Sequence, residues 1–184
     1  GGSVVVTGST ANENYDEGFD INANGPVTVE RCVAHRNTDD GFDLETSGNV
    51  VVTDSAADGG KDDDDADGFD IEAEGTVTIT RCTATGNAQE GIDVEYAGDN
   101  VSLTDCAAVG NGGEGLDLDE SGGWIHLENC STNDNEGAGV ECAAYGASGD
   151  LRLRNVTAIG NTSQNLLVGY IAGGIVIESS VVQD

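Results

Sequence analysis

Carboxylate side chains recur at a fixed place in a repeating pattern, and they are the residues of this chain best suited to chemistry. In six repeats an acidic residue follows a glycine by two positions and lies between two apolar residues, as in Gly41-Phe42-Asp43-Leu44. This alternation predicts that the acid points outward from a strand while its apolar neighbours point inward. These residues form a first acidic column: Asp20, Asp43, Asp70, Asp93, Asp117 and Glu141.

Further polar side chains are predicted to surround the first acidic column. Two residues further along the same predicted strands, and therefore on the same face, lies a second column: Asn22, Glu45, Glu72, Glu95 and Asp119. The segments that precede the strands add a rim of acids: Asp16, Glu17, Asp39, Asp40, Asp67, Glu90 and Glu114. We expect the carboxylates to be densest in the first three repeats.

Such columns favour a hard cation. Neighbouring acids on stacked strands lie about 4.8 Å apart, and each like-charge contact costs on the order of 1 kcal/mol even at the dielectric constant of water. A cation that takes roughly six to eight oxygen ligands would relieve this repulsion, and calcium fits best. We predict calcium ligands among the acids of the early repeats: Asp16, Asp20, Asp39, Asp40, Asp43, Asp67, Asp70 and Asp93.

The alternative interpretation is a solvated acidic face. The chain has 35 acidic residues against 6 basic ones, a formal net charge of −29, and such a surface is also typical of adaptation to high salt. Zinc or copper is not indicated, because His35 and His126 lie in different parts of different repeats. The two interpretations of the acids are compatible, and the sequence leaves both open.

The scaffold that positions these acids is predicted from self-similarity. Segments resembling V-x-V-x-x-C recur at steps of 23 to 27 residues, and each repeat holds short runs in which apolar and polar residues alternate. This pattern predicts an all-β fold, a single-stranded right-handed parallel β-helix with about seven coils of three short strands. We expect one domain over residues 1–184, a segment of a larger protein or assembly.

Three other rows are predicted to be structural. The cysteine row should form an internal ladder of small apolar side chains, and Cys142 should also lie in the core: Cys32, Cys82, Cys106 and Cys130. The asparagine row should form an amide ladder at a bend: Asn14, Asn37, Asn87, Asn111, Asn135 and Asn161. The glycine row is expected to permit a turn with positive φ: Gly18, Gly41, Gly68, Gly91, Gly115 and Gly139.

The repeat resembles the pectate-lyase-like right-handed β-helix superfamily over nearly the whole chain. Within it, Asn37-Thr38-Asp39-Asp40-Gly41-Phe42-Asp43-Leu44 is similar to the calcium-binding turn of family 9 polysaccharide lyases. That resemblance implies calcium ligands at Asp39, Asp40 and Asp43, with Asp16 as the partner from the preceding coil. The family's catalytic base is a lysine more than a coil beyond the aspartates. The chain departs from the pattern here, because its one lysine, Lys61, comes too early.

Composition excludes several functions. Six basic residues cannot form a nucleic-acid surface, and no apolar run is long enough to insert into a membrane. We expect an extracellular or cell-surface location and a non-enzymatic, calcium-binding module with a structural or adhesive role. Its partners would be an acidic polysaccharide or neighbouring β-helix subunits stacked at the end coils. The alternatives are a calcium-dependent uronate lyase that acts by β-elimination with Lys61, and a carbohydrate-binding domain.

Overall fold

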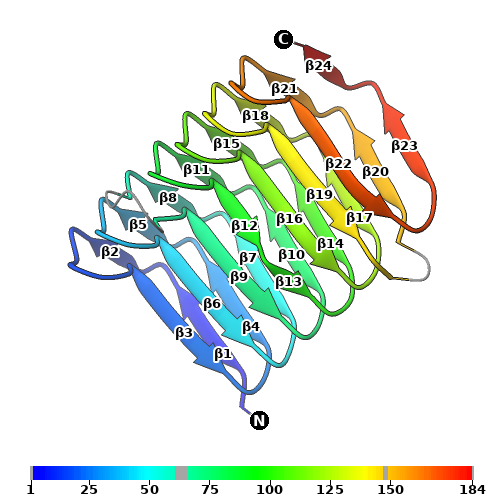
Figure 1. Ribbon diagram of the computed structural model, residues 1–184. Helices are drawn as coiled ribbons and strands as arrows, with labels where there is room; N and C mark the ends of the chain where they lie inside the picture. The colour runs from blue at the N-terminus through cyan, green and yellow to red at the C-terminus, as the bar shows by residue number, and fades with distance from the viewer. Residues whose placement is uncertain (1, 61–65, 147–148, 184) are drawn as a thin grey trace.

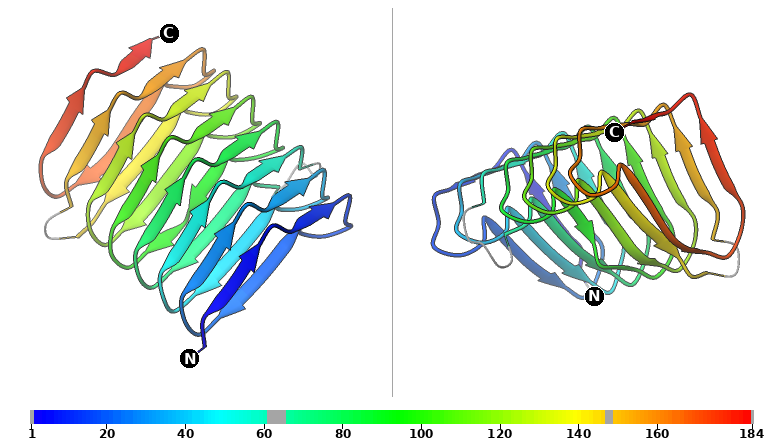
Figure 2. Two further views of the ribbon diagram at one scale, coloured as in Figure 1. Left: turned by 180° about the vertical axis from the view of Figure 1, so that it is seen from behind. Right: turned by 45° about the horizontal axis from the view of Figure 1, so that its top comes forward.

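The chain folds as a β-helix. A computed structural model describes residues 2–60, 66–146 and 149–183. Within these ranges every regular element is a β-strand, and the strands form three parallel sheets (Figure 1). One strand from each sheet makes a coil, and the coils stack along one axis with the two termini at opposite ends (Figure 2). The predicted all-β, right-handed parallel β-helix of about seven coils is confirmed.

In the described residues the first and second sheets have eight strands each, and in the third sheet one coil contributes two short strands. The first sheet contains β1 (Val4–Thr7), β4 (Val27–Glu30), β7 (Val50–Thr53), β10 (Val77–Thr80), β14 (Val101–Thr104), β17 (Ile125–Glu128), β20 (Leu151–Arg154) and β23 (Ile175–Glu178). The second contains β2 (Thr10–Asn12), β5 (Val33–His35), β8 (Ala56–Asp58), β11 (Thr83–Thr85), β15 (Ala107–Val109), β18 (Ser131–Asn133), β21 (Thr157–Ile159) and β24 (Val181–Gln183). The third contains β3 (Phe19–Ala23), β6 (Phe42–Thr46), β9 (Phe69–Ala73), β12 (Ile92–Val94), β13 (Tyr96–Ala97), β16 (Leu116–Ser121), β19 (Val140–Ala144) and β22 (Leu166–Ile171).

Alternation along each strand separates an inner from an outer face. In β6, Phe42, Leu44 and Thr46 are buried, whereas Asp43 is half-buried and Glu45 is exposed. The parallel pairing keeps equivalent residues in register from coil to coil, so one row of the repeat becomes one column of the structure. The sequence pattern therefore sets which side chains share a face.

The core is a stack of like side chains inside the coils. Phe19, Phe42 and Phe69 lie one above another, with ring centroids 4.8 Å and 4.7 Å apart. All five cysteines are buried and free, which confirms the cysteine row as part of the core. Burial raises the pKa of Cys82 and of Cys142 to about 12, so these thiols stay neutral and act as small apolar groups.

The asparagine row forms the predicted amide ladder. Where one asparagine follows another, the side-chain carbonyl of the second accepts two hydrogen bonds from the preceding coil. The Asn111 main-chain N–H and its Nδ2 both donate to Asn135 Oδ1 at 3.0 Å. Nδ2 also donates to the carbonyl of Ala84, at 3.4 Å. The same pattern joins Asn135 to Asn161. A buried polar row is thus satisfied entirely within the protein.

The expected reason for the glycine row is wrong. Left-handed backbone occurs elsewhere, at glycines such as Gly86 and at the corner residues Arg31 and Arg81, while the glycine row has ordinary φ angles. These glycines are needed for space instead. A Cβ on Gly91 would lie 2.6 Å from Asn111 Nδ2 and 2.6 Å from the Gly115 carbonyl oxygen. Close approach between coils, rather than a special turn, therefore selects glycine.

Candidate cation-binding surface

The outer face of the third sheet carries the acids, as the repeat predicts. Asp20, Asp43 and Asp70 are in register on β3, β6 and β9, and Asp93, Asp117 and Glu141 are in register on β12, β16 and β19. The first acidic column is therefore real. Its members from the second coil to the sixth are half-buried, whereas Asp20 in the end coil is exposed.

A β-bulge interrupts the second acidic column in the middle of the sheet. Ile92 pairs with Phe69, but Tyr96 rather than Glu95 pairs with Glu72, so the fourth coil has one extra residue at Glu95. The fifth coil keeps this register, and the sheet shifts back between β16 and β19. Bulges re-aim side chains next to functional sites, and this one turns additional acids and a tyrosine toward the same opening.

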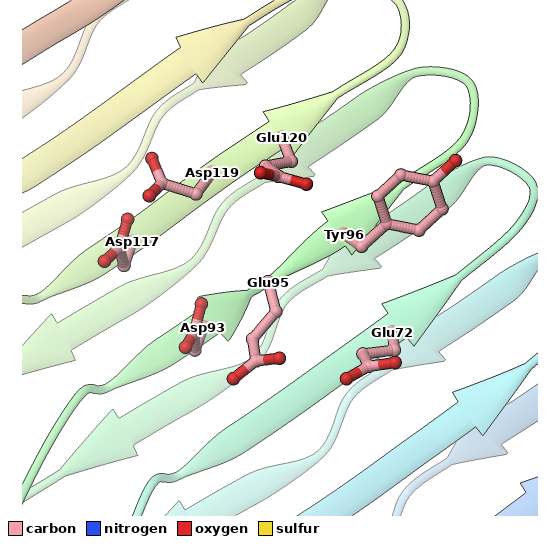
Figure 3. A pocket seen from close by; sticks show the side chains of 7 residues that line it. All are labelled: Glu72, Asp93, Glu95, Tyr96, Asp117, Asp119 and Glu120. Atoms are coloured by element: carbon pink, nitrogen blue, oxygen red, sulfur yellow. The ribbon is translucent and has the colours of Figure 1, made fainter.

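A cavity of about 520 Å³ lies over the bulge, on the third sheet (Figure 3). Asp93 and Glu95 on one strand stand beside Asp117 and Asp119 on the next, and Tyr96 and Glu120 lie toward the following turn. Seven side chains line the cavity: Glu72, Asp93, Glu95, Tyr96, Asp117, Asp119 and Glu120. The cavity is open, acidic and centred on the fourth and fifth coils.

Among the residues that the structure describes, two groups of three carboxylates have oxygens close enough to share an ion. At the cavity's edge, oxygens of Asp70, Asp93 and Glu95 all lie within 4.8 Å of one another; we call this the central cluster. At the start of the β-helix, oxygens of Asp16, Glu17 and Asp39 do the same; we call this the N-terminal cluster. Both groups offer oxygen donors alone, the ligand type of hard cations.

Electrostatics around the central cluster resist ionisation. The pKa of Asp93 is raised to about 9, first by desolvation and then by Asp117 and Asp70. Desolvation and the neighbouring acids raise the pKa of Asp117 to about 7, and Asp117 Oδ1 is buried with no hydrogen-bond partner among the described residues. The pKa of Asp43 is raised to about 6 by the same causes. Ionised carboxylates at these positions therefore need a compensating charge.

Two predicted ligands make contacts within the scaffold. Asp40 Oδ1 accepts a hydrogen bond from the Asp67 main-chain N–H at 2.7 Å, and Asp67 Oδ1 accepts one from the Glu90 main-chain N–H at 2.7 Å. Burial is the main cause that raises the pKa of Asp40 to about 8 and that of Asp67 to about 10. Each of these two acids uses one carboxylate oxygen to accept a hydrogen bond from the main chain of the next coil.

The eight predicted ligands are thus distributed over different places. Asp16 and Asp39 meet in the N-terminal cluster, and Asp70 and Asp93 meet in the central cluster. Asp20 and Asp43 face outward in register on β3 and β6, but neither belongs to a three-carboxylate group among the described residues. Lys61 and the acidic segment 62–65 lie outside the described residues.

Sequence reasoning placed Glu95 in the second column but did not foresee that Tyr96 and Glu120 would line a shared opening with it. The spacing of the repeats does indicate the bulge. The segment from Gly91 to Val101 is one residue longer than the segment from Gly68 to Val77, and the segment that follows Gly115 is longer by the same amount. That surplus is the bulge residue, although the sequence does not say on which side of the strand the extra residue is accommodated.

Other metal-binding side chains are engaged elsewhere. His35 Nδ1 lies 2.7 Å from Asp58 Oδ1 on the outer face of the second sheet. His126 stacks on Trp124, with ring centroids 3.9 Å apart, on the first sheet. Because the cysteines are buried in the core, nitrogen and sulfur donors do not converge with either carboxylate cluster.

Comparison with known proteins places the chain in a family. The profile of the family described as periplasmic copper-binding protein (NosD) matches residues 2–125, about two thirds of the chain. The chain belongs to the NosD family. No curated protein and no solved structure matches it.

The family match covers both carboxylate clusters of this NosD-family chain and ends at Ile125, where β17 begins. It supports the parallel β-helix superfamily that the repeat resembles, but not the narrower likeness to family 9 polysaccharide lyases. Over the described residues, no helix has the length and apolar character needed to cross a bilayer.

Proposed function

We propose that this NosD-family chain is a non-enzymatic, calcium-binding β-helix module that works outside the cytoplasm in a structural or adhesive role. The observation that carries the proposal is the central cluster. Its three carboxylates, Asp70, Asp93 and Glu95, lie within 4.8 Å of one another beside an acidic cavity. The family description supports the location, since it names a periplasmic protein.

The burial and mutual repulsion of these carboxylates favour the binding of calcium. The raised pKa of Asp93 and of Asp117 means that burial and mutual repulsion oppose their ionisation. A divalent cation stabilises the ionised forms by direct coordination, so binding would release protons. Calcium tolerates irregular oxygen coordination, whereas magnesium demands near-octahedral geometry and gives up its waters reluctantly. An open strip of carboxylates therefore suits calcium better.

Copper, the metal in the family's description, fits these clusters less well. Copper prefers imidazole and sulfur ligands, and this chain has no methionine. Its histidines lie on other sheets. We therefore treat copper as the competing outcome of the metal test.

The structural role is supported by the recurrence of the acids. The first acidic column places one carboxylate on each of six successive coils, whereas a catalytic site needs a single constellation of side chains.

The metal test combines thermal unfolding with direct titration. At fixed ionic strength, micromolar calcium should raise the melting temperature more than magnesium or copper(II) does, and calorimetry should show saturable calcium binding. Asp93→Asn and Glu95→Gln should lose both effects. Glu136→Gln, an exposed acid in the sixth coil, removes the same charge away from the clusters and should retain both.

Two results would contradict the assignment. If sodium chloride replaces micromolar calcium fully, the acids form a solvated face and the specific site does not exist. If copper(II) binds at the clusters and calcium does not, the family's metal is the correct one.

A calcium-dependent uronate lyase is the second candidate, and the N-terminal cluster is the observation that favours it. Asp16 and Asp39, two of the residues that match the lyase motif, do come together there with Glu17. Incubation with polygalacturonate or alginate, followed by ultraviolet absorbance of unsaturated product, tests it. Product that disappears in Lys61→Ala would replace the non-enzymatic proposal.

A further inference from the structure

The outer face of the first sheet differs sharply in charge from the molecule as a whole. The eight strands of this sheet are all described, and it lies behind the acidic third sheet in the view of Figure 1. Three of its outward side chains are acidic and two are basic. The face therefore has a net charge of −1, against −29 for the chain.

The few charges on this face are arranged unevenly from coil to coil. Glu30 lies on β4 in the second coil, whereas Arg152 and Arg154 lie on β20 in the seventh. Glu128 and Glu178 lie on the strands beside the two arginines. On the three strands in the middle of the face every outward side chain is uncharged: Val51, Thr53, Thr78, Thr80, Ser102 and Thr104.

We propose that this face binds a second copy of the chain, related to the first by a two-fold axis that runs parallel to the strands between β10 and β14. A two-fold interface uses the same surface on both copies. The coils of the second copy then run in the opposite direction, so that β4 of each copy covers β20 of the other.

The charges on the face select this arrangement. Glu30 and Arg154 both occupy the last position of their strands, so Glu30 of each copy faces Arg154 of the other. A two-fold axis along the β-helix axis would instead place β20 on β20 and bring the arginines together, and such a contact between like charges costs several kcal/mol. Arg154 already contacts Glu128, but a guanidinium has five N–H donors and can bind a second carboxylate.

An aromatic pair lies on the same face, near the arginines. Trp124 and His126 stack with ring centroids 3.9 Å apart, and a hollow of about 240 Å³ lies between His126 and the side chains of β20. The two-fold axis places β7 of the second copy over β17, so Val51, which is 37% exposed, faces His126. Tryptophan and arginine are enriched among the residues that dominate the energy of protein interfaces.

The size of the face sets the strength of the contact. Eight strands spaced by about 4.8 Å, each four residues long at about 3.3 Å per residue, cover about 500 Å² on each copy and about 1,000 Å² in total. This area is near the lower limit of a specific interface, which predicts a weak dimer. Because each copy has a charge of −29, added sodium chloride should strengthen the association by screening the long-range repulsion.

Sedimentation velocity of the full chain tests the dimer, over protein concentrations from micromolar to near millimolar and over a series of salt concentrations. Chelator is present throughout, so that the measurement does not depend on the proposed calcium site. Fluorescence of Trp124, the one tryptophan of the chain, gives a second readout, since its surroundings change when the two faces meet. We expect a reversible monomer–dimer equilibrium that shifts toward the dimer as salt is added.

A lysine in the uncharged centre of the face should disrupt the dimer. Ser102 on β14 would lie against β10 of the second copy, so Ser102→Lys should weaken the association at least about tenfold. Ser131→Lys makes the same change on the outer face of the second sheet, on β18, and is the matched control. It should leave the association unchanged.

A charge exchange tests the arrangement of the two copies. Glu30→Arg and Arg154→Glu should each weaken the dimer, because each places like charges opposite one another. The double variant restores opposite charges at both contacts and should recover most of the association. Melting temperatures of all the variants establish that each is folded.

Four results would contradict the proposal. A chain that stays monomeric at every protein and salt concentration has no such dimer, and an equal loss in Ser131→Lys would remove the first sheet as the interface. A double variant that associates no better than the single variants would overturn the two-fold arrangement. Association that appears only when calcium is added would assign the contact to the acidic third sheet instead.

Discussion

The asparagine row and the first acidic column are built in the same way and have opposite properties. Both place polar side chains in register along the β-helix axis, although Gly60 stands in the asparagine row in the third coil. In the asparagine row each amide both donates and accepts, so Asn111 and Asn135 satisfy each other in the buried interior. A carboxylate can only accept when it is ionised, so Asp93 and Asp117 repel each other. A self-complementary column stabilises the fold, whereas a column of like charges is left to bind something else.

The largest effect should come from breaking the asparagine row. Asn111→Ala removes the amide that links three coils and leaves buried main-chain groups without partners. We expect a loss of about 3 kcal/mol in the free energy of unfolding, measured by denaturant unfolding. Asn12→Ala on the exposed side of β2 is the control and should change little. Equal losses in both variants would show that the ladder has no special role.

A glycine substitution that crowds the asparagine row should cause the next largest loss of stability. Gly91→Ala places a Cβ 2.6 Å from Asn111 Nδ2 and 2.8 Å from the Ala108 Cβ, which forces the coils apart. Overpacking of this kind costs about 2 kcal/mol, and chemical denaturation measures it. Gly2→Ala has nothing within 4 Å and should be neutral. A neutral Gly91→Ala would refute the spatial explanation for the glycine row.

The acidic column should make the stability of the folded chain depend on pH. With pKa values of about 9 and about 7, Asp93 and Asp117 hold protons in the folded chain at pH values where the unfolded chain has lost them. The folded state then binds more protons, so in chelator stability should fall as pH rises from about 4 toward these values.

Calcium should oppose this fall, because it stabilises the ionised carboxylates. The measurement is a series of melting temperatures from about pH 5 to about pH 8, with chelator or with calcium. A double variant, Asp93→Asn with Asp117→Asn, should flatten the chelator curve, while Glu136→Gln should not. A wild-type melting temperature in chelator that rises across this range would contradict the raised pKa values.

The smallest predicted effect on stability concerns one buried polar residue, Thr132, whose hydroxyl is not satisfied in the way the asparagine row is. Thr132 is fully buried in a column of alanines that includes Ala84, Ala108 and Ala158, and its Oγ1 has no hydrogen-bond partner among the described residues. Thr132→Val keeps the shape and removes the unsatisfied hydroxyl, so it should stabilise the chain by about 1 kcal/mol. Thr85→Val on the exposed side of β11 is the control. A destabilised Thr132→Val would indicate that the hydroxyl has a partner in solution.

Much of the fold could be predicted because the period repeats one simple physical rule. The alternation of apolar and acidic residues in Phe42-Asp43-Leu44 recurs from the first coil to the sixth, and parallel pairing in register converts each row into a column. The site could be predicted only coarsely. The sequence indicates that Asp70, Asp93 and Glu95 share one face, but the bulge at Glu95 depends on how an extra residue is accommodated between paired strands.

By itself the sequence determined the β-helix, the buried cysteines, the amide ladder and the acidic face, since each follows from residue type and period. Only the tertiary structure decided which acids meet. It directs Asp40 and Asp67 to the backbone of the next coil, gathers Asp70 and Asp93 with Glu95, and sets Tyr96 beside Tyr145 across an intervening coil. The reason is physical. The period of the repeat specifies the face and the column on which a side chain lies. The distances between side chains depend on local register shifts and on the competition between backbone groups and ligands for each carboxylate oxygen.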